Sequence, residues 1–343
     1  MVCEQNIFLK PNQGYENKII SSMKCLLHIL FSLPCIEELC GLLQSLYTNR
    51  PQKTFMESFN NIFKDYKNVK KNLLSTTEYE KKINAFISEV FKRNSNEESG
   101  PRPATLFYMI SSIIKDEFLI LKPSHKNTIF SEDIDINNYP FDVILPRNDK
   151  IQLCKKLINN IKSFKSNNKG VFVDNFYIYK IIRDICPDCG HVYNIESFSG
   201  LFLDLKIEKE EEKIEDLINS FFEAYYPSTP YECSSCGSGY LLSRQNICLN
   251  SPNYLLLELE DRNKVYFNEI IDIPLFNGDK IVYVFIGAIY KKKCDTYSEF
   301  FAVTKQGNNI ICYNYDKNNI TECNDFNLMN SPKPSLAFYR KIQ

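Results

Sequence analysis

Apolar residues in the first half of the chain recur at three- and four-residue intervals, the spacing of helices that bury one face. Such stripes run over 19–31, 36–46, 55–66 and 83–90. Pro103, a residue suited to a first helical turn, predicts the start of a fifth helix, and residues 151–161 predict a sixth. The pattern predicts a helical lobe over residues 1–165.

The second half changes to short runs of β-branched and aromatic residues separated by turn signals. The clearest runs are YLLLELE from Tyr254, IVYVFIGAIY from Ile281 and FFAVT from Phe300. One amphipathic helix, predicted over 214–225, interrupts them. Helices first and strands later predict an α+β fold rather than alternating βαβ units, with a β-rich part over 166–343.

Composition narrows the class of protein. The 343 residues carry a net charge of −1, whereas a general nucleic-acid-binding chain is expected to be basic. The longest apolar run, Cys25–Cys35, has about half of the roughly 20 residues that cross a bilayer. Thirteen scattered cysteines, an odd number, do not resemble a disulfide framework. We therefore expect an intracellular protein, cytoplasmic or nuclear, that does not enter a membrane.

The strongest chemical signal is a pair of Cys-x-x-Cys-Gly sequences, formed by Cys186 with Cys189 and by Cys233 with Cys236. Two residues between thiols let both sulfurs of a turn face one ion, and two such turns complete a closed tetrahedral shell. The pattern predicts one structural Zn²⁺ with sulfurs about 4 Å apart. Two unrelated pairs and redox-active pairs are the alternatives, although a redox pair normally opens a helix in a βαβ unit.

Five segments along the chain match, in order, the motifs of one family. They are GYENKIISSMKCLLHILFSLP from Gly14, RPATLFYMISSIIKDE from Arg102, DICPDCGHVYNIESFSGLFLDLKIE from Asp184, YLLLELEDR from Tyr254, and the terminal segments from Tyr283 onward that end in PSLAFYRK. In this order they resemble the catalytic domain of ubiquitin-specific proteases, which are deubiquitinases. The resemblance implies a single papain-like domain over 1–343, with a helical thumb, a β palm and zinc-bearing fingers.

The catalytic positions implied by this resemblance are not intact. An active member uses a Cys nucleophile, a His base and an acidic or amide residue that orients the His. Aligned from Pro34, the nucleophile position holds Ser21, which we expect at the start of the central helix of the lobe; aligned from Gly14, it holds Ser22. The base position holds Glu299 and the orienting position Tyr315. A serine without a base to take its proton is a poor nucleophile, so we expect hydrolysis to be lost.

Few residues in the sequence could replace these groups. The only histidines are His28, His125 and His191, and we interpret His28 as structural and His191 as a surface residue. Cys25 lies one helical turn after Ser21 and is a conceivable substitute nucleophile, but no histidine from the last strands would assist it.

The resemblance and the lost catalytic groups together predict a pseudo-deubiquitinase. Its expected partner is ubiquitin, a ubiquitin-like protein or a subunit of an RNA-processing or other protein complex. One alternative is an active cysteine-type deubiquitinase with an atypical centre. Another is a zinc-ribbon nucleic-acid-binding protein, which the acidic run over 206–216 disfavours.

Overall fold

The computed structural model describes most of the chain, with several gaps. The described residues are 13–47, 54–70, 76–93, 102–121, 175–225, 232–239, 243–260, 264–275, 279–293, 298–307, 309–314, 319–323 and 333–342. The predicted sixth helix and the predicted boundary at residue 165 lie outside these residues.

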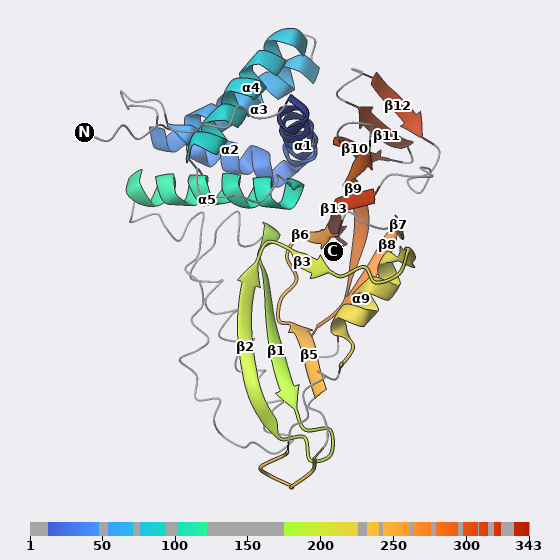
Figure 1. Cartoon of the computed structure of the whole chain (residues 1–343). Helices are drawn as coiled ribbons and strands as arrows, with labels where there is room; N and C mark the ends of the chain where they lie inside the picture. The colour runs from blue at the N-terminus through green and yellow to red at the C-terminus, as the bar shows by residue number, and fades with distance from the viewer. Residues whose placement is uncertain are drawn as a thin grey trace, which may run out of the picture.

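Five helices form a lobe at the N-terminal end of the chain (Figure 1). They are α1 (Gln13–Ser32), α2 (Pro34–Tyr47), α3 (Phe55–Lys70), α4 (Thr76–Arg93) and α5 (Pro103–Leu121). The four helices predicted from apolar spacing and the fifth predicted to begin near Pro103 are confirmed. Among the described residues no single helix is long and apolar enough to cross a bilayer; Lys18–Ser32 and Pro34–Leu42 reach that length only together, across a bend of 88°.

Local sequence explains where several of these helices begin. Pro34 and Pro103 occupy the first positions of α2 and α5, where the missing N–H costs nothing. The Thr54 hydroxyl accepts a hydrogen bond of 3.1 Å from the Glu57 backbone N–H and so caps α3. Because Pro34 starts α2 directly after α1, the two helices meet at a bend of 88°.

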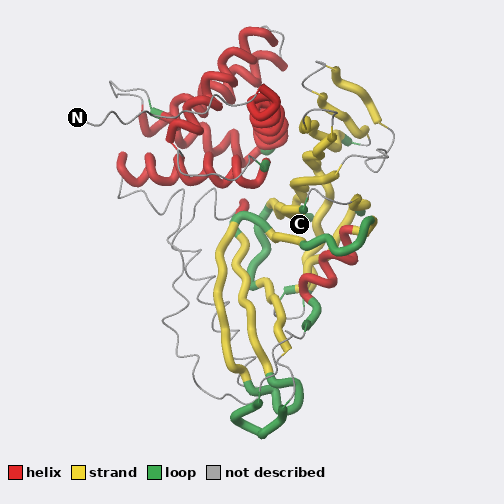
Figure 2. Tube along the Cα trace, in the orientation of Figure 1, coloured by secondary structure: helices red, strands yellow, loops and turns green. Residues whose placement is uncertain are grey.

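The described strands of the second half form three sheets (Figures 1 and 2). The largest has the order β12-β11-β10-β9-β13-β6-β3, with β8 also paired to β9. A separate three-stranded sheet, β2-β1-β5, projects away from it, and β4 pairs with β7. The strands are β1 (Ile178–Ile185), β2 (Val192–Gly200), β3 (Leu203–Leu205), β4 (Glu211–Lys213), β5 (Ser243–Cys248), β6 (Tyr254–Leu259), β7 (Lys264–Tyr266), β8 (Ile270–Pro274), β9 (Lys280–Lys293), β10 (Ser298–Gln306), β11 (Asn309–Asn314), β12 (Asn319–Cys323) and β13 (Lys333–Lys341).

The large sheet is buried on both faces, which explains the nearly continuous apolar runs of its strands. Alternate residues of one strand enter different cores: Leu256 of β6 packs with the helical lobe, whereas Leu255 and Leu257 pack with helix α9 (Ile214–Phe222). The helix predicted over 214–225 is thus confirmed but ends at Phe222. Helix α1 lies against β10, and this contact joins the two halves of the chain.

Candidate metal centre and the degenerate catalytic positions

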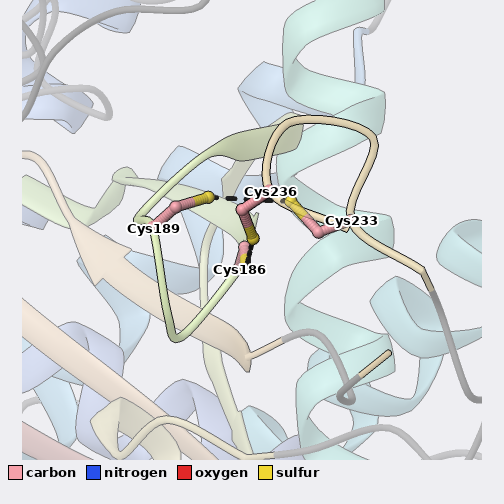
Figure 3. A group of neighbouring side chains, drawn as sticks. All are labelled: Cys186, Cys189, Cys233 and Cys236. Atoms are coloured by element: carbon pink, nitrogen blue, oxygen red, sulfur yellow. Dashed lines mark hydrogen bonds between the residues drawn. The ribbon is translucent and has the colours of Figure 1, made fainter. Parts of the chain in front are cut away.

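Four cysteines meet at the free end of the three-stranded sheet, where two loops face each other (Figures 2 and 3). Cys186 and Cys189 follow β1, and Cys233 and Cys236 precede β5. The Sγ atoms of Cys186 and Cys236 are 3.8 Å apart, those of Cys189 and Cys233 are 3.6 Å apart, and all four lie within 4.8 Å of one another. The predicted convergence of the two pairs is confirmed.

The two loops have the same backbone structure. Gly190 N–H donates to the Cys186 carbonyl at 2.9 Å, and Gly237 N–H donates to the Cys233 carbonyl at 2.7 Å. Both glycines adopt a left-handed conformation, with φ of 68° and 70°, which other residues enter at a cost. The Gly after each second cysteine therefore allows the tight turn that aims both thiols of a loop at one point.

The donor set fits a metal ion better than a redox pair. Cys186 and Cys189 lie in a turn between antiparallel strands, not at the start of a helix. The Ser238 hydroxyl donates a hydrogen bond to the Asp188 carboxylate and links the two loops beside the thiols. Four thiol ligands on two such turns suit a closed, tetrahedral ion that prefers sulfur.

Ser21 lies in the middle of α1, nine residues into the helix, and not at its start as expected. Its side chain is only 1% exposed. The Ser21 Oγ accepts a hydrogen bond of 3.2 Å from the Phe300 N–H in β10 and donates one of 3.2 Å to the Lys18 carbonyl. The hydroxyl therefore joins the helix to the sheet and has no contact with solvent.

The other catalytic positions are only partly described. Glu299 follows Ser298 at the start of β10, beside Phe300, and pairs across the sheet with Lys292. Because side chains alternate along a strand, Glu299 leaves β10 on the face opposite Phe300. Ser21 therefore contacts β10 through the backbone N–H of Phe300 and not through the side chain of Glu299. Tyr315 lies outside the described residues.

Cys25 and Ser22 are both fully buried in the helical lobe. Cys25 has an exposed fraction of 0% and packs in the core that α1 shares with the other helices. Ser22 is also 0% exposed, and its Oγ has no hydrogen-bond partner among the described residues. Neither side chain reaches solvent in this conformation.

His28 is buried between three elements, as its interpretation as a structural residue predicts. Its ring lies 3.6 Å, centroid to centroid, from the ring of Tyr313 in β11 and 5.6 Å from that of Tyr66 in α3. Burial, and secondarily the charge of Lys70, lowers the pKa of His28 from 6.5 to about 3. The imidazole is therefore neutral at physiological pH. No pattern in the sequence indicated Tyr66 or Tyr313 as its neighbours.

Several solved structures of Ubp8 have the same arrangement. No protein-family model and no curated protein matches the sequence. Ubp8 in a SAGA Ubp8/Sgf11/Sus1/Sgf73 DUB module bound to ubiquitin aldehyde matches with a TM-score of 0.66 at 15% identity, over 98% of this chain and 72% of that one. The chain has the ubiquitin-specific protease fold.

Two further Ubp8 structures support the assignment of the ubiquitin-specific protease fold. A substituted Ubp8 module bound to monoubiquitin matches with a TM-score of 0.64 at 15% identity, over 97% of this chain and 68% of that one. A yeast SAGA DUB module with an altered Sgf73 matches with a TM-score of 0.63 at 15% identity, over 97% and 68%. In the terms of this fold, α1–α5 form the thumb, the large sheet the palm, and β1, β2 and β5 the fingers.

Proposed function

We propose that this protein is a pseudo-deubiquitinase: a ubiquitin-specific protease fold that binds a partner without hydrolysing it. The observation that carries the proposal is the state of Ser21. Its hydroxyl is buried and engaged in hydrogen bonds to the backbone of Phe300 and Lys18. A nucleophile must reach the carbonyl carbon it attacks and must pass its proton to a base.

The described residues around Ser21 include no histidine that could act as its base. The described histidines are His28 and His191; His28 lies seven residues further along α1, about 10 Å by helical rise, and His191 lies at the finger tip. The low pKa of His28 makes its imidazole a weak base as well. These features support a domain retained for binding.

One structural zinc ion at the four finger cysteines is part of the same proposal. Four thiolates satisfy every coordination position of a tetrahedral ion, so no site is left for a substrate or for water. The ion would hold together two loops that have few apolar side chains of their own. Its role would be to fix the shape of the finger tip.

The partner we propose is ubiquitin or a ubiquitin-like protein, with a multi-subunit protein complex as the setting. Two similar Ubp8 structures contain ubiquitin aldehyde or monoubiquitin, and Ubp8 is there assembled with Sgf11, Sus1 and Sgf73. Such partners would place this protein in the cytoplasm or the nucleus.

The test is titration of the purified full chain with monoubiquitin by calorimetry, alongside incubation with a ubiquitin carrying a C-terminal fusion. We expect saturable binding and no cleavage. Cleavage of the fusion would contradict the loss of hydrolysis, and absence of binding at millimolar ubiquitin would contradict ubiquitin as partner.

The alternative of an active centre at Cys25 is tested with an electrophilic probe on the ubiquitin C-terminus. Because Cys25 is buried, we expect no adduct under reducing conditions. An adduct that forms on the wild-type chain and disappears in Cys25→Ser would establish the alternative. Salt-dependent binding of RNA or DNA would instead support the alternative of a zinc-ribbon nucleic-acid-binding protein.

A further inference from the structure

A cavity of about 360 Å³ lies where the thumb meets the palm, at the far end of α1 from Ser21. Phe31 at the end of α1 and Leu33 between α1 and α2 form part of its wall, and Thr304 of β10 forms another part. Ten residues of helix separate Ser21 from Phe31, which corresponds to about 15 Å of helical rise. The cavity is therefore distinct from the degenerate catalytic positions.

Four cationic side chains line this cavity, and none of the described residues that line it is acidic. Lys67 and Lys70 come from the last turn of α3, Lys305 from β10 and Arg340 from β13. Lysines in the last turn of a helix stabilise its dipole, which accounts for the α3 pair on structural grounds. That explanation does not extend to Lys305 and Arg340, which strands bring to the same place.

Two of the four charges have no counter-ion among the described residues. Lys67 pairs with Glu37 at 3.0 Å, and Lys305 pairs with Glu269. Lys70 makes no described ion pair; its Nζ lies 4.8 Å from the centre of the Tyr66 ring, and Arg340 likewise has no described ion pair. Partial burial, followed by the charge of Lys67, lowers the pKa of Lys70.

A buried hydroxyl at the same cavity adds a donor. Thr304 is 4% exposed, and its hydroxyl lies beside the hydroxyl of Tyr313. The carboxyl end of α1 and the amino end of α2 meet here, so their dipoles offset. The side chains therefore give the cavity its positive charge.

We propose that this cavity binds a small anion that carries two linked phosphate groups. Such a ligand has two to three negative charges and so matches the two cations without counter-ions, Lys70 and Arg340. Ammonium groups act as point charges for phosphate, and a guanidinium binds it through two N–H groups. A volume near 360 Å³ is at the small end of ligand pockets, which favours a small molecule over a folded partner.

The experiment is calorimetric titration of the full chain with inorganic pyrophosphate, and with citrate as a carboxylate of similar charge. We expect pyrophosphate to bind and Lys70→Gln and Arg340→Gln each to weaken it about tenfold or more, since each removes a charge-assisted contact. Lys280→Gln, an exposed charge at the start of β9 away from the cavity, should leave binding unchanged. Binding should also weaken as salt is raised.

Three outcomes would overturn the proposal: no pyrophosphate binding at millimolar concentration, equal binding by the Lys70→Gln and Lys280→Gln variants, or equal affinity for citrate. Equal binding by the variants would mark an adventitious ion only. Thermal unfolding of each variant without ligand checks that it is folded. The inference does not depend on ubiquitin binding and survives if that proposal fails.

Discussion

At the scale of the residue, the adjacent Ser21 and Ser22 are both buried but differ in hydrogen bonding. The Ser21 hydroxyl accepts the Phe300 N–H, whereas the Ser22 hydroxyl is buried with no described partner. Ser21→Ala would leave a buried backbone N–H without an acceptor. We expect the free energy of unfolding to fall by about 1–3 kcal/mol, measured by urea denaturation.

Ser22→Ala is the matched control. It removes a buried hydroxyl whose desolvation costs free energy that no described hydrogen bond offsets. We expect this variant to be as stable as the wild type or more stable. If the two variants lose equal stability, the contact between Ser21 and β10 does not stabilise the fold.

The buried imidazole of His28 makes stability depend on pH. Its pKa is about 3 in the folded state and near 6.5 in the unfolded state, so below pH 6.5 the unfolded chain binds the proton more tightly. This contribution to stability is intact above pH 6.5 and is lost as pH falls towards 3. The largest slope is about 1.4 kcal/mol per pH unit.

The groups that face His28 are Tyr66 and Lys70 from α3 and Tyr313 from β11. In His28→Phe, which keeps an aromatic ring in place, the fall in stability between pH 6.5 and 4 should become shallower. Urea unfolding at several pH values measures it. An unchanged slope would show that other groups, not His28, dominate acid sensitivity.

The sequence predicts some residues of the candidate site, but not the contacts that these residues make in the fold. The motif order assigned Ser21 and Glu299 to the catalytic positions, which stays a prediction. His28 was interpreted as structural, and it is buried. The hydrogen bond from Phe300 to Ser21 joins residues 279 apart in sequence, and no local pattern encodes it. The cations that line the cavity come from α3, β10 and β13, so local sequence does not predict that they converge.

At the scale of the element, the crossing of α1 over the palm depends on Gly287 in β9. A Cβ at this position would lie 2.7 Å from the Val303 carbonyl oxygen and 3.5 Å from the Ile29 side chain of α1. Gly287→Ala must therefore push a backbone carbonyl aside. We expect a loss of about 1–3 kcal/mol in chemical denaturation, the usual range for overpacking.

Gly41 in α2 provides the comparison, because a Cβ there meets nothing within 4 Å. Gly41→Ala should raise stability by about 0.4–1 kcal/mol through helix propensity and a less flexible unfolded chain. A loss of stability in this variant would mean that α2 is not helical at this position.

Elements with a clear periodicity were predicted well, and those without one were not. Helices α1 to α5 present apolar stripes, and β6, β9 and β10 present long apolar runs. Strands β2 and β5, with the sequences VYNIESFSG and SRQNIC, have no such run. Their pairing with β1 is visible only in the fold.

At the scale of the whole molecule, two hydrophobic cores lie on opposite faces of the palm sheet. The finger tip lies far from both (Figure 1). The thumb and the palm are stabilised by buried apolar surface. The two cysteine loops at the tip contribute mostly polar residues to the structure, such as Asp188 and Ser238. Their stability should therefore depend on the metal ion, in contrast to the rest of the chain.

Replacement of one ligand separates these two sources of stability. Cys189→Ser should reduce zinc from about one ion per chain to near zero, because a closed four-thiolate site tolerates the loss of a ligand poorly. Elemental analysis of the purified protein measures the metal. Limited proteolysis should then cut near the β1–β2 turn while the helical lobe stays resistant, since its core contains no part of the finger tip.

Cys40→Ala is the control for a cysteine outside the cluster. Cys40 is buried in the thumb, so its replacement should lower the stability of the lobe and leave the zinc content unchanged. A chelator applied to the wild type should reproduce the Cys189→Ser pattern of proteolysis. If Cys189→Ser retains its zinc, or if the chelator leaves the finger tip resistant, the ion does not hold the two loops together and the four sulfurs converge for packing reasons alone.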